Sequence, residues 1–352
     1  MKQFLTFKPE SQQRIMQQLS VIDTFKGSWS VLEQSKSNYL KELRKIATIQ
    51  SIGSSTRIEG AELTDQEVEK LLSSVKINKL EKRDEQEVIG YYETLEVILE
   101  NYSDIPLSES YVHQLHGMLL KHSHKDQPHK GKFKNLSNQV AAEYPDGTKR
   151  IIFNTTEPHL TGVEMEALLT WVNERLDQQD VHPLLIVSTF VYEFLSIHPY
   201  QDGNGRLSRL LTTLLLLKLD YQFVQYVSFE HLIENKKEEY YKALMSGQKN
   251  RYQPDEQIDE WTIYFLDRLI ELTKKLEEKY RTYSQLKTVL NPRQQLVLDY
   301  IQTEGTVQLK DLNESLKKYS RNTLKKDLTY LVDQGLIIRT GAGRGTRYIV
   351  KK

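Results

Sequence analysis

Apolar residues recur at helical spacing over most of the chain. Between residues 62 and 124 they lie three or four positions apart, and they include Val68, Leu71, Leu72, Val88, Tyr91, Leu95, Ile98 and Leu99. Such spacing places the apolar side chains on one face of a helix. Residues 10–50, and the region that begins at Thr161, have the same character. The pattern predicts a mainly α fold.

One region departs from this helical pattern. Residues 149–153 alternate as a short strand, and residues 145–148 (PDGT) have the composition of a turn before it. A β-hairpin is therefore predicted within residues 131–158. The Leu-rich run 210–219 is too short to span a bilayer and is interrupted by Thr212, Thr213 and Lys218. It predicts a buried core helix, and we expect no membrane association.

The last 60 or so residues form a separate pattern after the linker signal at 290–292. Three helices are predicted at 293–303, 309–316 and 320–334, with Ser320 as the N-cap of the third. Two strands follow at 336–339 and 347–350, joined by the glycine turn 341–345. Three helices followed by a hairpin look like a winged helix, a small α+β domain.

Charge is distributed unevenly between this C-terminal region and the rest of the chain. Residues 291–352 contain twelve basic and six acidic side chains, a net charge of +6, whereas the whole chain is neutral. Basic side chains on the third helix and the wing are what contacts to a nucleic-acid backbone need. Many winged helices bind proteins instead, so DNA and protein both stay open as partners.

Size and composition limit the remaining possibilities. The chain has 352 residues, 38% of them apolar, which suffices for one large and one small domain. We expect an N-terminal helical region at 1–105, a core at 106–285 and the winged helix at 291–352. The absence of cysteine excludes disulfides, thiol catalysis and cysteine-bound zinc. The N-terminus has no continuous apolar segment, so a cytoplasmic protein is expected.

Residues 198–209, HPYQDGNGRLSR, carry the most specific chemistry. Gly203 and Gly205 let backbone N–H groups converge on one point, where the following helix also directs its positive end. Arg206 and Arg209 are three residues apart, so both can reach a phosphate chain with planar donor groups. A triphosphate suits this arrangement.

The same segment supplies a metal ligand and a base. Asp202 is the kind of carboxylate that Mg²⁺ accepts when it keeps its waters and bridges to substrate phosphates. His198 is the group that can take a proton near neutral pH. A plain helix-loop-helix corner with solvated arginines is the alternative, but it does not account for a histidine, an aspartate and two spaced arginines together.

At these residues the chain resembles the Fic family, whose signature is HPFxDGNGRxxR, with Tyr200 in place of the phenylalanine. The resemblance covers about residues 50–250 and implies a Fic-type helical core that transfers AMP from Mg-ATP to a hydroxyl of a target protein. It implies His198 as general base, Asp202 as the Mg²⁺ ligand and Arg206 and Arg209 as β- and γ-phosphate ligands. Further α- and β-phosphate ligands are implied at Gly203, Asn204 and Gly205.

The resemblance extends to the predicted hairpin. In Fic proteins a β-hairpin flap upstream of the motif clamps the target by strand addition, which uses backbone hydrogen bonds. Residues 131–134 (GKFK) resemble the lead-in to that flap. A target protein is therefore expected to dock near 131–158, although an incidental surface hairpin is the plain alternative.

A second motif lies at residues 54–60, SSTRIEG. Alone it indicates a helix terminus with Gly60 in a left-handed conformation. Beside the Fic signature, Ser55, Glu59 and Gly60 resemble the inhibitory motif (S/T)xxxE(G/N) of the class with an N-terminal inhibitory helix, near residues 50–60 here. The resemblance implies that Glu59 pairs with Arg209 and blocks seating of the γ-phosphate.

Two further groups of residues have alternative interpretations. The segment 239–244 resembles the family's nucleoside pocket, which implies adenine contacts from Tyr240, Tyr241, Leu244 and Gln248; the alternative is that these aromatics are core. Five histidines could suggest a metal cluster, but they lack carboxylate or thiolate companions at ligand spacing. They are His113, His116, His122, His124 and His129.

The sequence therefore predicts an auto-inhibited protein adenylyltransferase with ATP as substrate and Mg²⁺ as cofactor, able to modify a target and itself. The alternative is a DNA-binding transcriptional regulator whose Fic domain senses nucleotide or modifies only itself. The sequence leaves open the target, UMP or phosphocholine transfer, removal of AMP, and the oligomeric state, a homodimer included.

Overall fold

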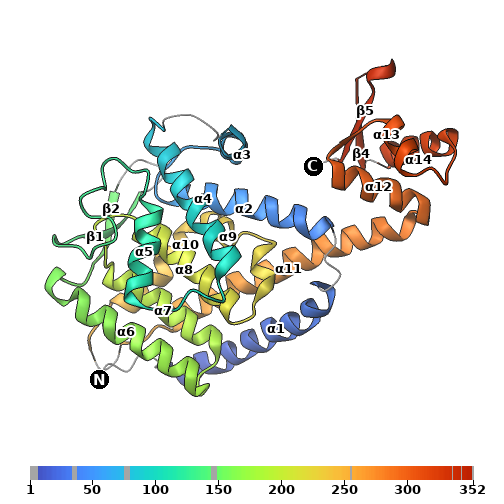
Figure 1. The fold of residues 1–352 in the computed structure, drawn as a ribbon. Helices are drawn as coiled ribbons and strands as arrows, with labels where there is room; N and C mark the ends of the chain where they lie inside the picture. Colours follow the sequence, from blue (N-terminus) through green and yellow to red (C-terminus); the bar gives the residue numbers. More distant parts are fainter. Residues whose placement is uncertain are drawn as a thin grey trace. The chain divides into compact units, whose positions relative to one another are not determined.

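The structure is a computed structural model that describes residues 7–33, 38–74, 80–143, 149–253, 256–334, 336–341 and 343–350. The chain divides into two compact units (Figure 1). The larger unit comprises residues 1–34 and 43–275, and the smaller unit comprises residues 35–42 and 276–352. The boundary falls within the continuous helix α11, so the domain limits expected at 105, 285 and 291 stay predictions.

The larger unit is built almost entirely from helices, as predicted. Its helices are α1 (Pro9–Glu33), α2 (Asn38–Ile58), α3 (Asp65–Ser74), α4 (Arg83–Asn101), α5 (Glu109–Leu119), α6 (Pro158–Gln178), α7 (Pro183–Ile197), α8 (Asn204–Lys218), the 3-10 helix η1 (Gln222–Gln225), α9 (Phe229–Glu234), α10 (Lys237–Gln248) and α11 (Asp259–Val289). The first residues of α2 and the last turns of α11 belong to the smaller unit.

Helices α7 and α8 form the centre of the larger unit and pack against each other, with α6, α4 and α5 around them (Figure 1). The leucines of α8 from Leu207 to Leu217 are at most 1% exposed. A helix that is apolar on nearly all sides is stable only when neighbours surround it. This confirms the prediction of a buried core helix at 210–219. No described helix has the length and apolar character needed to cross a bilayer.

A two-stranded hairpin interrupts the helices. Strands β1 (Gln139–Glu143) and β2 (Lys149–Asn154) pair antiparallel, with a bulge between Val140 and Ala141. This confirms the predicted strand at 149–153, while the turn predicted at 145–148 lies outside the described residues. The bulge bends β1 near its start.

The smaller unit has the predicted winged-helix pattern. Its elements are α12 (Pro292–Glu304), β3 (Thr306–Val307), α13 (Leu309–Ser315), α14 (Arg321–Asp333), β4 (Ile337–Thr340), the 3-10 helix η2 (Gly343–Gly345) and β5 (Arg347–Val350). The strands form one antiparallel sheet in the order β3-β5-β4. Ser320 caps α14 by accepting the Thr323 N–H, as predicted. The short strand β3 was not predicted.

The smaller unit has its own hydrophobic core. Leu324, Leu328 and Leu331 of α14 are fully buried at spacings of four and three residues, against Val297 and Ile301 of α12. The helices therefore bury the apolar stripes that the sequence pattern indicated.

Candidate active site

The loop between α7 and α8 holds its shape through two left-handed residues. His198 ends α7 with φ 52°, and its N–H donates to Phe194 O. Gly203 precedes α8 with φ 79°, a conformation that glycine adopts without strain. The Asn204 side chain ties the loop together, because it accepts the Tyr200 N–H at 2.8 Å and donates to Tyr200 O at 2.6 Å. These hydrogen bonds engage the Asn204 side chain within the loop, whereas its backbone N–H lies in the first turn of α8.

His198 is arranged as a neutral base. Its Nδ1 lies 3.2 Å from Leu195 O, and because a carbonyl only accepts, Nδ1 carries the proton. Nε2 is then the atom with the free electron pair. Burial lowers the pKa of His198 to about 4, against a smaller opposing effect of the Leu195 carbonyl. At neutral pH the imidazole is ready to accept a proton.

A stack of rings supports the loop from below. His116 and Tyr200 are both fully buried and stack with ring centres 3.7 Å apart. His116 Nε2 donates to Asp202 O at 3.0 Å, and its Nδ1 accepts the Gly131 N–H at 2.8 Å. Burial lowers the pKa of His116 to about 4, so the ring is neutral. The Tyr200 ring thus packs inward.

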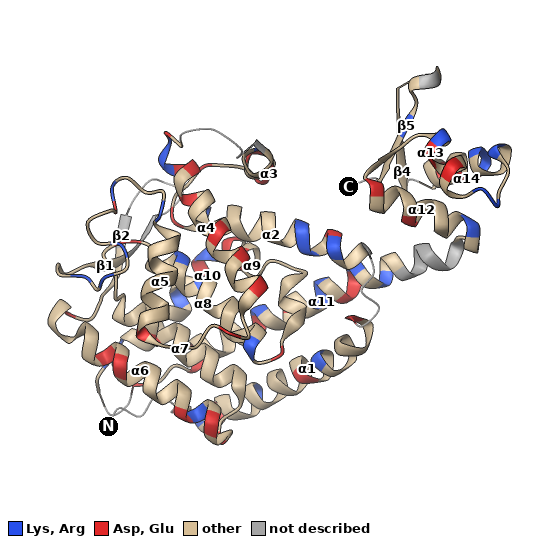
Figure 2. Ribbon diagram, viewed as in Figure 1, with Lys and Arg blue, Asp and Glu red and all other residues tan. Residues whose placement is uncertain are grey.

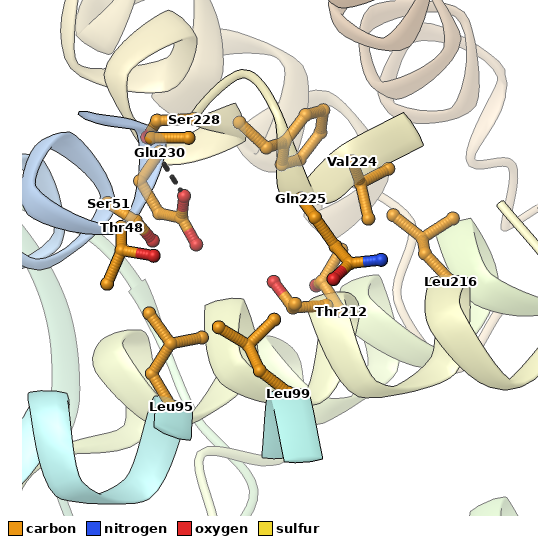
Figure 3. Close-up of a pocket in the computed structure, with 13 residues that line it drawn as sticks. Thr48, Ser51, Leu95, Leu99, Thr212, Leu216, Val224, Gln225, Ser228 and Glu230 are labelled. Carbon is orange, nitrogen blue, oxygen red and sulfur yellow. Dashed lines mark hydrogen bonds between the residues drawn. The ribbon is translucent and has the colours of Figure 1, made fainter. Parts of the chain in front are cut away.

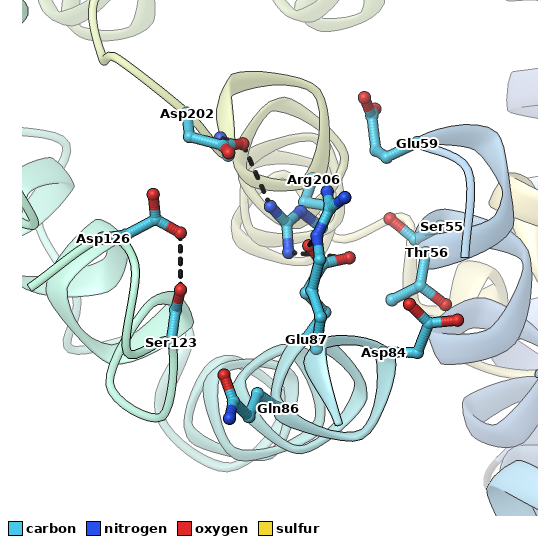
Figure 4. Close-up of polar contacts among 12 residues, drawn as sticks. Ser55, Thr56, Glu59, Asp84, Gln86, Glu87, Ser123, Asp126, Asp202 and Arg206 are labelled. Atoms are coloured by element: carbon cyan, nitrogen blue, oxygen red, sulfur yellow. Dashed lines mark hydrogen bonds and ion pairs between the residues drawn. The ribbon is translucent and has the colours of Figure 1, made fainter. Parts of the chain in front are cut away.

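Asp202 and Arg206 form a second polar group (Figure 4). Arg206 is only 1% exposed and lies between Asp202 Oδ1, at 3.2 Å, and Glu87 Oε2 of α4, at 3.4 Å. Burial alone would raise the pKa of the Asp202 carboxyl, but the charge of Arg206, the Gly203 N–H and Lys125 together keep the pKa below its ordinary value. Lys125 approaches the other carboxylate oxygen at 3.5 Å. Asp202 is therefore an ionised carboxylate beside the loop.

Arg209 is held by the end of α2. Its Nε donates to Ser55 Oγ at 2.7 Å, and its Nη2 donates to Ser55 O at 2.9 Å and to Glu59 Oε1 at 2.7 Å. Arg209 is 3% exposed, whereas the Glu59 side chain keeps a third of its surface exposed. The ion pair implied by the resemblance is thus present. Burial would raise the pKa of Glu59, but the charge and hydrogen bond of Arg209, together with the charge of Arg206, hold the pKa below its ordinary value.

The Glu59 carboxylate also lies directly against Gly205, in the first turn of α8. A Cβ built on Gly205 would collide with Glu59 Oε1, so only glycine leaves room for the carboxylate there. This position is the positive end of a buried helix, where an anion is favoured. Glu59 therefore occupies the place at which a phosphate oxygen is expected.

The end of α2 is anchored independently of Arg209. Arg57 binds Glu234 of α9 through two hydrogen bonds of 2.6 and 3.0 Å, and it also contacts Asp65 at 2.9 Å. Gly60 follows with φ 96°, as predicted for a residue that terminates the helix. These contacts hold Ser55 of α2 and the following Glu59 against α8.

Lys134 joins the hairpin to the active-site loop. It is 4% exposed, and its Nζ donates to Asn138 Oδ1, Thr155 Oγ1 and Ile197 O at 2.8 to 2.9 Å. Its backbone N–H donates to Pro199 O at 2.8 Å. Burial lowers the pKa of Lys134 to about 8. One side chain therefore connects both ends of the hairpin to the residue before His198.

The residues expected to line a nucleoside pocket lie on α10, and two of them are core. Tyr240 is 4% and Leu244 1% exposed, and the Tyr240 ring is edge-on to Trp261 and Tyr241. Gln248 is half-buried and donates to Ser196 Oγ at 2.5 Å, two residues before His198. No cluster of three or more acidic or histidine side chains is placed for metal binding in the described parts of the chain.

The pattern of residues did not identify several partners of the motif. Glu87 and His116 touch the motif from α4 and α5, Lys134 touches it from the segment before the hairpin, and Arg57 fixes α2. The only sequence signal for these partners was charge, at the expected helix ends and in residues 131–134 (GKFK). None of these residues stands near the motif in sequence, so spacing could not reveal them.

Two family profiles match parts of the chain. The Fic/DOC family profile matches residues 106–216, and a DeoR-like helix-turn-helix domain profile matches residues 293–345. The protein adenylyltransferase Fic of Drosophila melanogaster is 26% identical over 207 residues, which are 58% of this chain and 39% of the relative. The relative from Drosophila mojavensis is 25% identical over 205 residues. The chain thus matches about two fifths of the length of these curated relatives.

Solved structures share the fold. A Fic family protein from Desulfovibrio desulfuricans G20 superposes with a TM-score of 0.65 at 21% identity and covers 100% of this chain and 98% of its own. Fic-1 of C. elegans, residues 134–508, superposes with a TM-score of 0.62 at 17% identity over 78% and 75% of the two chains. At these identities the likeness concerns the fold alone.

Proposed function

We propose that this chain, which carries a Fic domain followed by a DeoR-like helix-turn-helix domain, is an auto-inhibited protein adenylyltransferase. The enzyme class rests on the adenylyltransferase relatives and on the complete motif 198–209. The auto-inhibition rests on one observation, the ion pair between Glu59 and Arg209.

In the proposed reaction, a hydroxyl oxygen of the target attacks the α-phosphorus of ATP and pyrophosphate leaves. The hydroxyl proton passes to His198 Nε2, which the Leu195 carbonyl keeps unprotonated and oriented. Backbone N–H groups at Asn204 and Gly205, with Arg206, hold the phosphates at the start of α8. Positioning and charge compensation supply most of the catalysis in such transfers.

The residues present fit a magnesium ion of the kind that ATP brings with it. Asp202 is one ionised carboxylate, and Mg²⁺ typically takes one or two carboxylates together with phosphate oxygens and waters. Asp202 would hold the ion, which neutralises phosphate charge when bound. Because Arg206 and the Gly203 N–H already fix Asp202 Oδ1, Oδ2 is the atom available to it.

Auto-inhibition follows from competition for one place. Glu59 neutralises Arg209 and fills the space above Gly205, so a γ-phosphate meets a carboxylate instead of a free guanidinium. The negative charges of the Glu59 carboxylate and a γ-phosphate in contact with it repel strongly in a site with little water. ATP would therefore be seated poorly until the end of α2 moves.

The proposal extends to the hairpin and to the location of the protein. Strands β1 and β2, with the exposed Leu136 and Ile151 near them, supply backbone and apolar surface for a target segment. Self-modification and a cytoplasmic location belong to the same proposal.

A transfer assay with ATP labelled at either the α- or the γ-phosphate tests the proposal. The unmodified chain and its Glu59→Gly variant are each incubated with Mg²⁺, cell lysate and either label, and proteins are separated on a denaturing gel. Label from the α-phosphate, but not from the γ-phosphate, should enter a target or the chain itself. Transfer of the γ label would assign a kinase reaction, and transfer of neither label by the Glu59→Gly variant would reject the proposal.

DNA binding is the second candidate function, and the surface of α14 favours it. Arg321, Lys325 and Lys326 of this third helix are exposed, as are Arg339 and Arg347 in the wing. Figure 2 colours the Lys and Arg positions of the ribbon blue, those of α14 included. Arg293 is different, because it forms a 2.6 Å ion pair with the buried Asp327 and is not free for phosphate. We propose that α14 and the wing contact a duplex, and that protein docking at the same face is the competing outcome. A fluorescently labelled duplex titrated with the full chain tests it.

A further inference from the structure

A second carboxylate contacts Arg206, and the proposed reaction gives it no role. Glu87 of α4 is buried, and its Oε2 lies 3.4 Å from Arg206 Nη1 (Figure 4). Asp202 Oδ1 lies 3.2 Å from Nη2 of the same guanidinium. Glu87 precedes residues 106–216, which the Fic/DOC profile matches, so the family motif does not account for it. One buried guanidinium therefore has two carboxylates.

These two carboxylates cancel the charge of Arg206. Arg206 is only 1% exposed, so water screens its interactions with Asp202 and Glu87 little. Arg83 donates to Glu87 Oε1 at 2.8 Å, but its side chain is 64% exposed. Lys125, which approaches Asp202, is 74% exposed. Water screens these outer cations strongly. A phosphate that approaches Arg206 therefore meets no net positive charge from the buried group.

Arg206 nevertheless keeps unused hydrogen-bond donors. Its Nε and Nη1 are buried and form no hydrogen bond with the described residues, since the contact between Nη1 and Glu87 is an ion pair without hydrogen-bond geometry. Buried donors are almost always satisfied, so these two atoms indicate a ligand with acceptors, such as phosphate oxygens. Arg206 can thus give a phosphate hydrogen bonds but no surplus charge. The positive charge has to come with the nucleotide.

Another buried carboxylate beside α8 has different partners. Glu230 is 2% exposed and accepts hydrogen bonds from the Tyr91 and Ser228 hydroxyls, each at 3.1 Å, of which Figure 3 shows the second. Within the described ranges, no lysine or arginine forms an ion pair with Glu230. This fold can therefore bury an acid without a guanidinium, and burial alone does not explain why Glu87 faces Arg206.

We propose that Glu87 makes nucleotide binding at Arg206 depend on a divalent cation. The inference rests on the proposed function, in which Arg206 holds the β-phosphate. Because Glu87 and Asp202 together cancel the charge of Arg206, a metal-free diphosphate keeps its own negative charges uncompensated. A Mg²⁺ complex of the diphosphate carries two further positive charges and is favoured by the same carboxylates. Glu87 is thus a specificity-determining residue that acts through Arg206.

Calorimetry with ADP tests the proposal, because ADP lacks the γ-phosphate that Glu59 obstructs. The full chain is titrated with ADP in EDTA and, separately, in excess magnesium chloride. The unmodified chain should bind Mg-ADP at least about tenfold more tightly than metal-free ADP, the usual effect of one neighbouring charge. Equal affinities in the two buffers would overturn the inference. Absence of binding in both buffers would reject the proposed function, and this inference with it.

Two substitutions at Glu87 separate its charge from its packing. Glu87→Gln keeps the shape but removes the charge, so metal-free ADP should bind more tightly and the preference for Mg-ADP should shrink by at least about tenfold. Glu87→Asp keeps the charge and should keep most of the preference. An unchanged preference in Glu87→Gln would assign Glu87 to packing and would reject this inference alone.

Glu230→Gln and Glu100→Gln are the matched controls. Glu230→Gln removes a buried carboxylate that is held by hydroxyls, and Glu100→Gln removes an exposed one near the end of α4. Both should keep the preference for Mg-ADP, and an equal loss in Glu230→Gln would overturn the inference. If Glu87→Gln does not fold, as judged by tryptophan emission, Glu87→Asp decides, because loss of the preference in that charged variant contradicts the inference.

Discussion

The active-site loop and helix α14 both carry arginines, but the arginines have opposite surroundings. Arg206 and Arg209 are at most 3% exposed. Asp202 and Glu87 hold Arg206, and Glu59, directly after α2, holds Arg209. Glu87 and Glu59 lie more than 100 positions away from these arginines in sequence. Arg321 and Lys325 project from α14 into solvent, and the structure gives them no ion pair among its described residues. One set is fixed before any ligand arrives, whereas the other is free to meet a partner.

This difference has energetic consequences. Removing the partner of a buried guanidinium lowers the free energy of unfolding by several kcal/mol. Substitutions at the loop are therefore expected to have large and specific effects. Exposed basic side chains contribute to nucleic-acid affinity through counterion release. Substitutions on α14 are therefore expected to have small, additive effects that depend on salt. Removing side chains in either region tests whether this contrast governs function.

The largest effect is expected at His198. His198→Ala removes the proton acceptor and should lower AMP transfer by about 10²–10⁴-fold, the usual contribution of a general base. Mg-ATP affinity measured by calorimetry should change little, because the phosphate ligands lie elsewhere. His159→Ala, at an exposed position, is the control. Transfer at the unmodified rate in His198→Ala would remove this residue from the reaction.

The next largest effect has the opposite sign. Glu59→Gly frees Arg209 and the space above Gly205, so AMP transfer should rise by about tenfold to a hundredfold, given about 1.5–3 kcal/mol for a charged hydrogen bond. Glu59→Gln, which keeps a hydrogen bond but no charge, should fall between. Initial rates of label transfer provide the measurement.

Glu62→Gly is the matched control for that series, since Glu62 is an exposed acid three residues further on. It should leave the rate unchanged. If Glu62→Gly activated as strongly as Glu59→Gly, loosening of the chain after α2 would explain the gain and the ion pair would not.

The sequence predicted the loop better than its surroundings, and the reason is physical. Glycines, a histidine and spaced arginines act within twelve residues, so their chemistry is visible in a short string. The hold of Arg57 on Glu234 spans 177 positions, and the three bonds of Lys134 join segments up to 63 positions apart. Such contacts depend on how helices pack, which periodicity does not specify.

The C-terminal unit was predicted well for a different reason. Its helices are short, α14 has a clear apolar stripe, and capping residues such as Ser320 mark helix starts. Strand β3 was missed because two residues, Thr306 and Val307, have no measurable alternation. The internal pairing of Arg293 with Asp327 was also hidden, so the count of basic residues overstated the charge available for a partner.

A moderate effect is expected from the buried ring beneath the loop. His116 has a pKa of about 4 in the folded chain and an ordinary value of 6.5, so the unfolded chain takes up the proton first as pH falls. Stability should therefore decline between pH 6.5 and 4, with about 2–3 kcal/mol due to His116. His116→Asn should be less stable at pH 7 but should lose less on acidification.

Urea unfolding followed by tryptophan emission at several pH values measures this, because the three tryptophans report on the larger unit. His159→Asn, an exposed histidine, should keep the pH dependence of the unmodified chain. Parallel pH curves for His116→Asn and the unmodified chain would show that the ring is not buried in its neutral form.

The smallest effect is expected on α14, and it distinguishes the two classes of partner. Arg321→Ala combined with Lys325→Ala should weaken duplex binding and reduce the slope of log affinity against log salt by about 1.8, since each phosphate contact contributes about 0.9. Fluorescence anisotropy of a labelled duplex over about 50–200 mM salt provides the slope.

Arg293→Ala serves as the control, because Arg293 pairs with Asp327 within the unit. Loss of Arg293 should lower stability, and the salt slope should stay the same. If the Arg321→Ala, Lys325→Ala variant binds the duplex with an unchanged slope, the exposed basic side chains of α14 do not contact phosphate. This face is then available for a protein partner. In that case the contrast between buried and exposed arginines would separate a phosphate site at the loop from a protein-docking surface at the wing.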